Sequence, residues 1–181
     1  MDNSCPIKRN IVLTGFMGTG KSTVGKLLAE NLKYNFVDTD GLISESAGLD
    51  IPSIFEIGGE EYFRALERET IERLLDFHQG EYVIATGGGS VISGKNRNTM
   101  KKAGIILLLT AAPDAILERI GHNLDRPLLK GENAPETIKR LLKERDPYYR
   151  DCCKAFETTG KSAEIVCKEI LAFIGKREMF F

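Results

Sequence analysis

The sequence predicts a three-layer α/β/α fold built on a five-stranded parallel sheet, and two patterns support this prediction. Short apolar runs alternate with longer segments in which apolar residues recur every three or four positions. Such alternation is typical of a parallel sheet covered by helices. The second pattern is the glycine-rich stretch 15–22, which directly follows the first apolar run, because loops of this kind connect a buried strand to a helix.

The elements follow from the same periodicities, taken in order along the chain. Apolar runs predict strands at 10–14, 35–38, 82–86 and 105–110 and a weaker one at 155–158. Helical spacing predicts helices over 21–33, 59–77, 112–120, 135–145 and 163–173. Two segments are less regular, 49–58 and 121–133, and the second combines glycines and Pro127 with the basic residues Arg126 and Lys130. We expect one domain, 1–181, with 121–133 as a mobile lid.

The loop Gly15-Phe16-Met17-Gly18-Thr19-Gly20-Lys21-Ser22 fits the G-x-x-x-x-G-K-[ST] pattern of phosphate-binding loops. Its glycines let backbone N–H groups turn toward a polyphosphate, and the following helix N-terminus adds its positive dipole end. Lys21 is expected to reach the β- and γ-phosphates and the Ser22 hydroxyl to bind Mg²⁺. The alternative is a glycine-rich turn with an incidental lysine, which requires strand, loop and helix all to be coincidental.

Two further strands end in unusual residues, at the sheet edge where parallel sheets bind ligands. Asp38-Thr39-Asp40 places two carboxylates on alternate residues, which point the same way if strand geometry continues through them. One could hold Mg²⁺ and the other a substrate hydroxyl; the alternative is N-capping of a helix that starts at Gly41. Gly87-Gly88-Gly89 would let the backbone approach a ligand closely, or form a plain turn.

Composition excludes several classes of protein. With 25 basic and 26 acidic residues, nothing favours an electrostatic grip on nucleic acid or on an anionic membrane. No apolar run approaches the roughly 20 residues of a membrane span, and the N-terminus lacks a signal pattern. The four cysteines have no metal-ligand spacing. We therefore expect a cytoplasmic protein that binds small molecules and acts as a monomer.

Taken in order, these segments resemble shikimate kinase, a family of small kinases with the phosphate-loop kinase fold of nucleoside monophosphate kinases. The resemblance runs through essentially the whole chain. It rests on 15–23, on Asp38-Thr39-Asp40, on Ile54-Phe55-Glu56-Ile57-Gly58-Gly59-Glu60-Glu61-Tyr62-Phe63-Arg64, on Gly87-Gly88-Gly89, on Arg126-Pro127-Leu128-Leu129 and on Glu144-Arg145-Asp146-Pro147-Tyr148-Tyr149. It implies transfer of the γ-phosphate of ATP to the 3-hydroxyl of shikimate, a step toward chorismate and the aromatic amino acids, with Mg²⁺ as cofactor.

The resemblance also implies residue roles. In the region around 40–67 and beyond it, shikimate would be bound by Asp40, Phe55, Phe63, Arg64, Gly87, Gly88, Gly89 and Arg145, with the two arginines on its carboxylate and Glu67 orienting an arginine. ATP would be bound by Gly18, Thr19, Gly20, Lys21, Ser22, Thr23, Arg119 and Arg126, with Arg119 on the adenine. Ser22 and Asp38 would hold Mg²⁺, and Lys21, Asp40 and Arg126 would act in catalysis. The residue that packs on the second face of the adenine stays open, as does the role of Phe180-Phe181.

Proteins with different functions use the same loop. Asp38-Thr39-Asp40-Gly41 fits the D-x-x-G pattern of a regulatory GTPase, but the chain lacks an Asn-Lys-x-Asp or Thr-Lys-x-Asp motif that would read guanine. A gluconate or nucleoside monophosphate kinase would carry such a loop, and so would a binding protein that retains the fold without catalysis. A carboxylate clamp of Arg64 and Arg145 would discriminate against a nucleotide acceptor.

Overall fold

The fold was analysed in a computed structural model, which describes residues 9–77, 80–121, 133–150, 152 and 154–178. Five strands form one parallel sheet in the order β2-β3-β1-β4-β5, as predicted. They are β1 (Asn10–Thr14), β2 (Asn35–Asp38), β3 (Tyr82–Ala85), β4 (Gly104–Thr110) and β5 (Lys154–Glu157). Because β1 is paired with both β3 and β4, the loops that follow β1 and β3 lie next to each other at one edge of the sheet.

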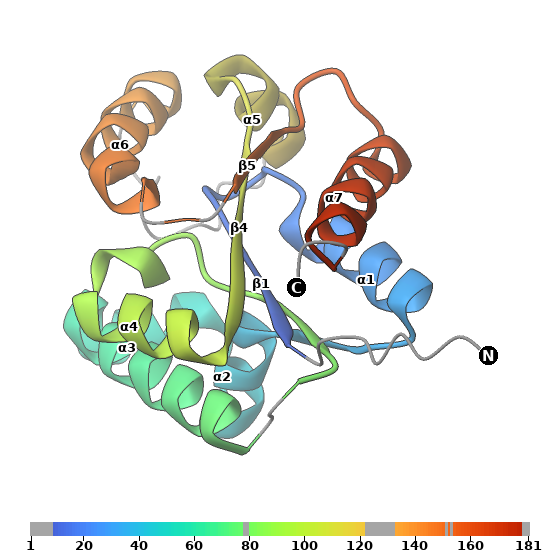
Figure 1. The fold of residues 1–181 in the computed structure, drawn as a ribbon. Coiled ribbons are helices and arrows are strands. Elements are labelled where there is room, and N and C mark those ends of the chain that lie inside the picture. The colour runs from blue at the N-terminus through green and yellow to red at the C-terminus, as the bar shows by residue number, and fades with distance from the viewer. Residues whose placement is uncertain (1–8, 78–79, 122–132, 151, 153, 179–181) are drawn as a thin grey trace.

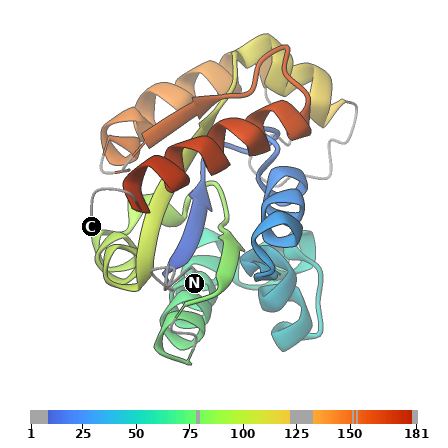
Figure 2. The same ribbon diagram turned by 45° about the vertical axis from the view of Figure 1, so that its right-hand side comes forward.

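Helices connect the strands. They are α1 (Lys21–Leu32), α2 (Thr39–Ala47), α3 (Ile51–Phe77), α4 (Gly94–Ala103), α5 (Pro113–Ile120), α6 (Ala134–Tyr149) and α7 (Ala163–Glu178), with a short 3₁₀ turn η1 (Ser90–Ile92) before α4. Figure 1 shows α1 and α7 on one side of the sheet and α3 and α4 on the other. Figure 2 shows α7 lying across the sheet beside α1. The predicted three layers are therefore present.

The core divides along the alternation of the strands. Ile11 and Leu13 of β1 pack with α1 and α7, whereas Val12 between them packs with α3 and α4. In β4, Leu107 and Leu109 face the first layer and Ile106 and Leu108 the second. Successive side chains of a strand point to opposite faces, so a continuous apolar run is what a strand buried on both faces requires.

The structure corrects three predicted elements. Segment 49–58 was expected to be irregular, but α3 already begins at Ile51 and changes direction at Gly59, where φ is 69°. Strand geometry does not continue through Asp40, because α2 begins at Thr39. Helix α4 was not predicted, since among its residues only Asn96 and Met100 are buried and its polar sequence carries no apolar stripe.

Among the described residues, no helix is long and apolar enough to cross a membrane. The two cysteines that the structure describes, Cys152 and Cys167, take part in no disulfide.

Candidate active site

The phosphate loop lies between β1 and α1 and is held by its own side chains. The carbonyl of Phe16 accepts hydrogen bonds from Thr19 Oγ1 at 2.7 Å and from Lys21 Nζ at 3.0 Å, which draws the lysine ammonium across the loop. Gly20, with φ 89°, is the N-cap residue of α1, and as a glycine it has no side chain that could accept a hydrogen bond from the first N–H groups of this helix. The first N–H groups of α1 and the Lys21 charge are therefore available at one place for an anion.

Ser22 and Asp38 lie in contact at the start of α1 and the end of β2. Ser22 Oγ donates to Asp38 Oδ2 at 2.6 Å, while Asp38 Oδ1 accepts from the Asp40 backbone N–H at 3.1 Å. Asp38 thus caps α2, as the capping interpretation held, and still offers an oxygen beside Ser22. A hydroxyl and a carboxylate next to a phosphate loop are hard oxygen ligands of the kind Mg²⁺ takes together with substrate phosphates. Among the described residues, no group of three or more His, Cys, Asp or Glu side chains is arranged so that it could hold a metal ion.

Asp40 lies in the first turn of α2 and faces the turn after β3. A Cβ atom placed on Gly87 would lie 2.8 Å from Asp40 Oδ1 and 2.6 Å from Glu67 Oε1. The Gly87 N–H donates to Thr39 Oγ1 at 3.1 Å, which ties this turn to α2. Two carboxylates are therefore packed against one glycine, and any side chain at Gly87 would displace them.

Arg64 is held by two glutamates of its own helix, α3. Its Nη1 donates to Glu67 Oε2 at 2.9 Å and its Nη2 to Glu60 Oε1 at 3.0 Å. Burial works against the charge on Arg64, but Glu67 and Glu60 outweigh it and raise the pKa of the guanidinium. Glu67 is 1% exposed and also accepts from Ser90 Oγ at 2.7 Å. The network therefore runs from the buried Glu67 through the partly buried Arg64 to Glu60, whose side chain is 54% exposed.

Arg145 reaches the same region from α6. Its side chain is buried, with 4% of the residue exposed, and its guanidinium lies over the Phe16 ring, 5.3 Å from the centroid. The phosphate loop therefore contacts an arginine that was predicted to bind the acceptor.

The two phenylalanines predicted to flank the substrate pack against each other on α3. The Phe55 and Phe63 ring centroids are 4.8 Å apart. Phe63 is buried with Ile43 and Ile54, and its ring lies 5.2 Å from the guanidinium carbon of Arg64. Phe63 is thus both a core residue and a support for the arginine.

The turn Gly87–Gly89 is enclosed on two sides by these groups. A Cβ on Gly88 would lie 3.2 Å from Gly15 O and from the Met17 backbone N, and one on Gly89 would lie 2.4 Å from Arg64 Nη2. The glycines are needed here for close approach rather than for an unusual φ, since Gly89 has φ −100°. The turn touches the phosphate loop through Gly88 and the Arg64 guanidinium through Gly89.

Tyr149 contacts this turn and was not singled out from the sequence. Its hydroxyl donates to Gly88 O at 2.9 Å. The helix predicted from apolar spacing ended at Arg145, four residues earlier. In the structure α6 continues through Pro147 to Tyr149. A tyrosine four residues after a predicted ligand arginine was the available signal.

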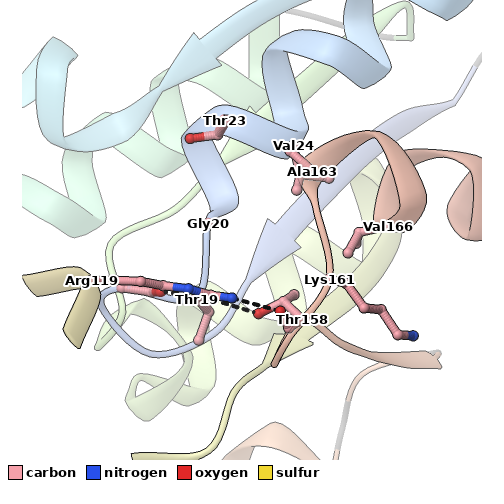
Figure 3. A pocket seen from close by; sticks show the side chains of 10 residues that line it. Thr19, Gly20, Thr23, Val24, Arg119, Thr158, Lys161, Ala163 and Val166 are labelled. Carbon is pink, nitrogen blue, oxygen red and sulfur yellow. Dashed lines mark hydrogen bonds between the residues drawn. The ribbon is translucent and has the colours of Figure 1, made fainter. Parts of the chain in front are cut away.

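A pocket of about 340 Å³ lies beside the phosphate loop (Figure 3). On one side Arg119 of α5 donates to Thr158 Oγ1 at 2.8 Å, to Thr158 O at 2.6 Å and to Gly18 O at 3.2 Å. Ala163 and Val166 lie on the α7 side, and Lys161 is held nearby by Glu169. The pocket is lined by Gly18, Thr19, Gly20, Thr23, Val24, Arg119, Thr158, Lys161, Ala163 and Val166. It brings the predicted adenine arginine together with the phosphate loop and offers apolar side chains opposite.

Arg126 and the rest of segment 122–132 lie outside the described residues. Only the ends of the predicted lid, Gly121 and Asn133, are described. The role of Arg126 therefore stays a prediction.

A family model described as shikimate kinase matches residues 17–175. The chain belongs to the shikimate kinase family. It is 49% identical over 170 residues to a shikimate kinase of Geobacter sulfurreducens, covering 94% of this chain and 93% of that protein. It is 45% identical over 163 residues to a shikimate kinase of Caldanaerobacter subterraneus, covering 90% and 94%.

Solved structures of the family superpose closely. The shikimate kinase of Acinetobacter baumannii, solved in complex with shikimate, has a TM-score of 0.90 and 38% identity and covers 95% of this chain and 96% of that one. The shikimate kinase of Aquifex aeolicus has a TM-score of 0.78 and 39% identity, covering 90% and 94%. Membership in the shikimate kinase family excludes the regulatory GTPase as an interpretation of Asp38-Thr39-Asp40-Gly41.

Proposed function

We infer that this chain is an ATP-dependent shikimate kinase of aromatic amino-acid biosynthesis, and we propose that it transfers the γ-phosphate of ATP to the 3-hydroxyl of shikimate. The observation that carries this proposal is the contact between the two halves of the site. The phosphate loop after β1 and the glycine turn after β3 touch through Gly88, and Arg64 and Arg145 lie beside that contact.

The donor half is the phosphate loop with the adjoining pocket. ATP phosphates would be bound by the backbone of residues 18–23 and by Lys21, whose ammonium stabilises the charge on the transferred group. The adenine would lie between Arg119 and the apolar side chains of Ala163 and Val166. Arg119 is suited to this role because its hydrogen bonds to Thr158 hold the guanidinium plane in place.

The acceptor half is built for a small carboxylate that carries hydroxyl groups. Arg64 and Arg145 would bind the shikimate carboxylate, since a planar guanidinium matches a carboxylate with two parallel hydrogen bonds. Asp40 and the N–H groups of the 87–89 turn would bind ring hydroxyls, and Phe55 and Phe63 would contact the carbocycle. Glu60 and Glu67 already compensate the charge on Arg64. The shikimate carboxylate would therefore chiefly compensate the charge on Arg145.

Ser22 and Asp38 are the residues that would hold Mg²⁺. The ion, when bound with ATP, would supply positive charge at the phosphates and would stabilise the negative charge that ADP gains as the leaving group. The 2.6 Å contact between Ser22 and Asp38 supports this assignment, because it already brings the two oxygen ligands to one point at the mouth of the phosphate loop.

The proposed reaction is a direct in-line transfer without a phosphorylated enzyme. The shikimate 3-oxygen forms a bond to the γ-phosphorus as the bond to the β,γ-bridging oxygen breaks, and ADP leaves with that electron pair. Asp40 holds the hydroxyl in line and accepts its proton. Because the transition state of phosphoryl transfer is loose, orientation is the larger part of its role.

The chain would act in the cytoplasm, as a monomer, on small molecules alone. The nearly balanced charge of the sequence supports the absence of nucleic-acid partners. Gel filtration of the purified protein would test the monomer, with a dimer peak as the contrary result.

A coupled assay of ADP release with Mg·ATP tests the function. Shikimate should support turnover, whereas gluconate and nucleoside monophosphates should give rates at the level without acceptor. The position of the new phosphate is read from phosphorus–proton coupling in the product's NMR spectrum. Turnover with a nucleoside monophosphate but not with shikimate would overturn the assignment of the acceptor.

A further inference from the structure

Tyr149 joins two parts of the site that are far apart in the sequence. It is the last residue of α6, only 7% exposed, and its hydroxyl donates to the carbonyl of Gly88, 61 residues earlier. Its ring packs in the core between the sheet and α3 and α4. The hydroxyl is the polar end of an otherwise apolar contact, and it reaches a main-chain oxygen.

The residue that accepts this hydrogen bond is itself packed against the phosphate loop. A Cβ on Gly88 would come within 3.2 Å of Gly15 O and of the Met17 backbone N, so the main chains of the two loops are in direct contact. The next residue, Gly89, lies against the Arg64 guanidinium. A movement of the Gly88 carbonyl would therefore alter the distance from the phosphate loop to the acceptor arginine.

Helix α6 contacts both loops with one face. Arg145 and Tyr149 are four residues apart and so lie on the same side of the helix. Arg145 lies over the ring of Phe16 in the phosphate loop, while Tyr149 bonds to the turn after β3. One helix thus contacts both the donor loop and the acceptor turn.

The hydroxyl is a hydrogen-bond donor at any physiological pH. Burial raises the pKa of Tyr149 to about 12, even though Arg145 and Arg64 act in the opposite direction.

We propose that Tyr149 is a positioning residue, whose hydroxyl bond to Gly88 O fixes the Gly87–Gly89 turn and Arg64 at a set distance from the phosphate loop and from Arg145. It touches neither ATP nor shikimate in this proposal and acts through the turn. The proposal rests on the proposed function, because it assigns the turn and the arginines to shikimate.

Tyr149→Phe removes the hydroxyl and keeps the ring, and Tyr148→Phe is the matched control. Tyr148 is adjacent, more exposed, and contacts Arg97 through its ring rather than its hydroxyl. Dissociation constants for shikimate and for Mg·ADP should be measured by calorimetry, together with kcat. For Tyr149→Phe we expect a roughly 3- to 10-fold weaker shikimate affinity, the value of about one net hydrogen bond. We also expect a lower kcat, with Mg·ADP affinity within about twofold of wild type.

The outcomes are distinct. If wild-type protein binds no shikimate, the proposed function itself fails. If wild type binds shikimate and Tyr149→Phe binds it equally well while only the melting temperature falls, Tyr149 is structural and the positioning role is wrong. An equal weakening of shikimate and Mg·ADP would also overturn it, because that result indicates general loosening.

If Tyr149→Phe does not fold, a second variant tests the distance between the Gly87–Gly89 turn and the phosphate loop. Gly88→Ala keeps Tyr149 but presses a methyl group against Gly15 and Met17, which moves the turn from the phosphate loop by a few tenths of an ångström. We expect kcat to fall at least about tenfold, because phosphoryl transfer depends on the distance between oxygen and phosphorus. An unchanged kcat would show that this distance is not critical and would contradict the proposal.

Discussion

Arg64 Nη1 donates to Glu67 Oε2 at 2.9 Å, and Glu67 is 1% exposed. The glutamate is also bonded to Ser90, beside the glycine turn, so one carboxylate joins α3 to the acceptor end of β3. Glu60 and Glu67 therefore fix the orientation of the Arg64 guanidinium, and they would determine how well it receives the carboxylate that we propose it binds.

Substituting Glu67 should weaken shikimate binding more than ATP binding. Glu67→Gln keeps the shape but removes the charge that holds Arg64, at a cost of about 1.5–3 kcal/mol for a charge-assisted hydrogen bond. We expect the shikimate KM to rise at least about tenfold and the ATP KM to stay within about threefold. Glu69→Gln is the control, since Glu69 is 55% exposed and pairs with Arg73 on the surface of the same helix. Equal kinetics of the two variants would contradict the role of Glu67.

Asp38→Asn should separate capping from metal binding. Asparagine caps a helix about as well as aspartate, so the melting temperature should change little. Loss of the negative charge next to Ser22 should raise the Mg²⁺ concentration for half-maximal rate by about tenfold or more. The measurement is the rate against total Mg²⁺ at fixed ATP, with chelation by EDTA abolishing activity in both proteins. An unchanged Mg²⁺ dependence with a lower melting temperature would leave only the capping role.

Asp40→Asn tests the role of the second carboxylate. Asparagine can still hold the hydroxyl but cannot take its proton, and loss of a general base typically lowers rates by about 10²–10⁴-fold. Because orientation is the larger part of the proposed role, we expect a fall in kcat near the lower end of that range. Rapid-quench measurement of a single turnover isolates the transfer step. Near-complete retention of turnover would exclude Asp40 as the base.

Gly89→Ala should displace Arg64 without straining the backbone. Gly89 has φ −100°, which alanine adopts readily, but the new methyl group would lie 2.4 Å from Arg64 Nη2. We expect the shikimate KM to rise by about tenfold, equal to about 1.4 kcal/mol, with little change in the ATP KM. Gly175→Ala in α7 is the control, because nothing lies within 4 Å of its added Cβ. That change should stabilise the protein by about 0.5–1 kcal/mol without affecting kinetics.

The buried Tyr149 predicts a loss of stability at high pH. Its pKa is raised from 10.0 to about 12, chiefly by burial. Below pH 10 the tyrosine is protonated in both folded and unfolded chains, so its contribution is fully present there. Between pH 10 and about 12 only the unfolded chain releases the proton, and the free energy of unfolding falls by about 1 kcal/mol per pH unit.

Denaturant titrations of wild type and Tyr149→Phe at pH 9, 10 and 11 measure this contribution. Other groups titrate in the same range, but they are common to both proteins. The difference in unfolding free energy should therefore shrink above pH 10. A constant difference would show that Tyr149 ionises at its ordinary pKa.

The sheet could be predicted from the sequence because its signal is local. Each strand is a short apolar run, and burial on both faces makes such runs continuous. The phosphate loop was equally local, since its pattern, the strand before it and the helix after it are adjacent in the chain. Helix α4 carries no such signal, because most of its side chains are polar and only Asn96 and Met100 are buried.

The contacts within the site depend on tertiary structure that no local pattern contains. Tyr149 reaches Gly88 only because α6 continues through Pro147, whose missing N–H would ordinarily end a helix. Arg145 lies over Phe16, 129 positions away by sequence number, and neither residue type indicates the other. Arg64 and Glu67 lie one helical turn apart. Helical spacing shows that they are neighbours, but it does not show that Ser90, from another element, also binds the glutamate.

The strand order β2-β3-β1-β4-β5 places the loops that follow β1 and β3 side by side, because these two strands are neighbours in the sheet. Adjacent strands are about 4.8 Å apart, so strand pairing sets how closely the proposed donor loop and the proposed acceptor turn approach each other. A reaction and its reverse pass through the same transition state. The proposed arrangement would therefore also serve the reverse transfer, from the phosphorylated product back to ADP.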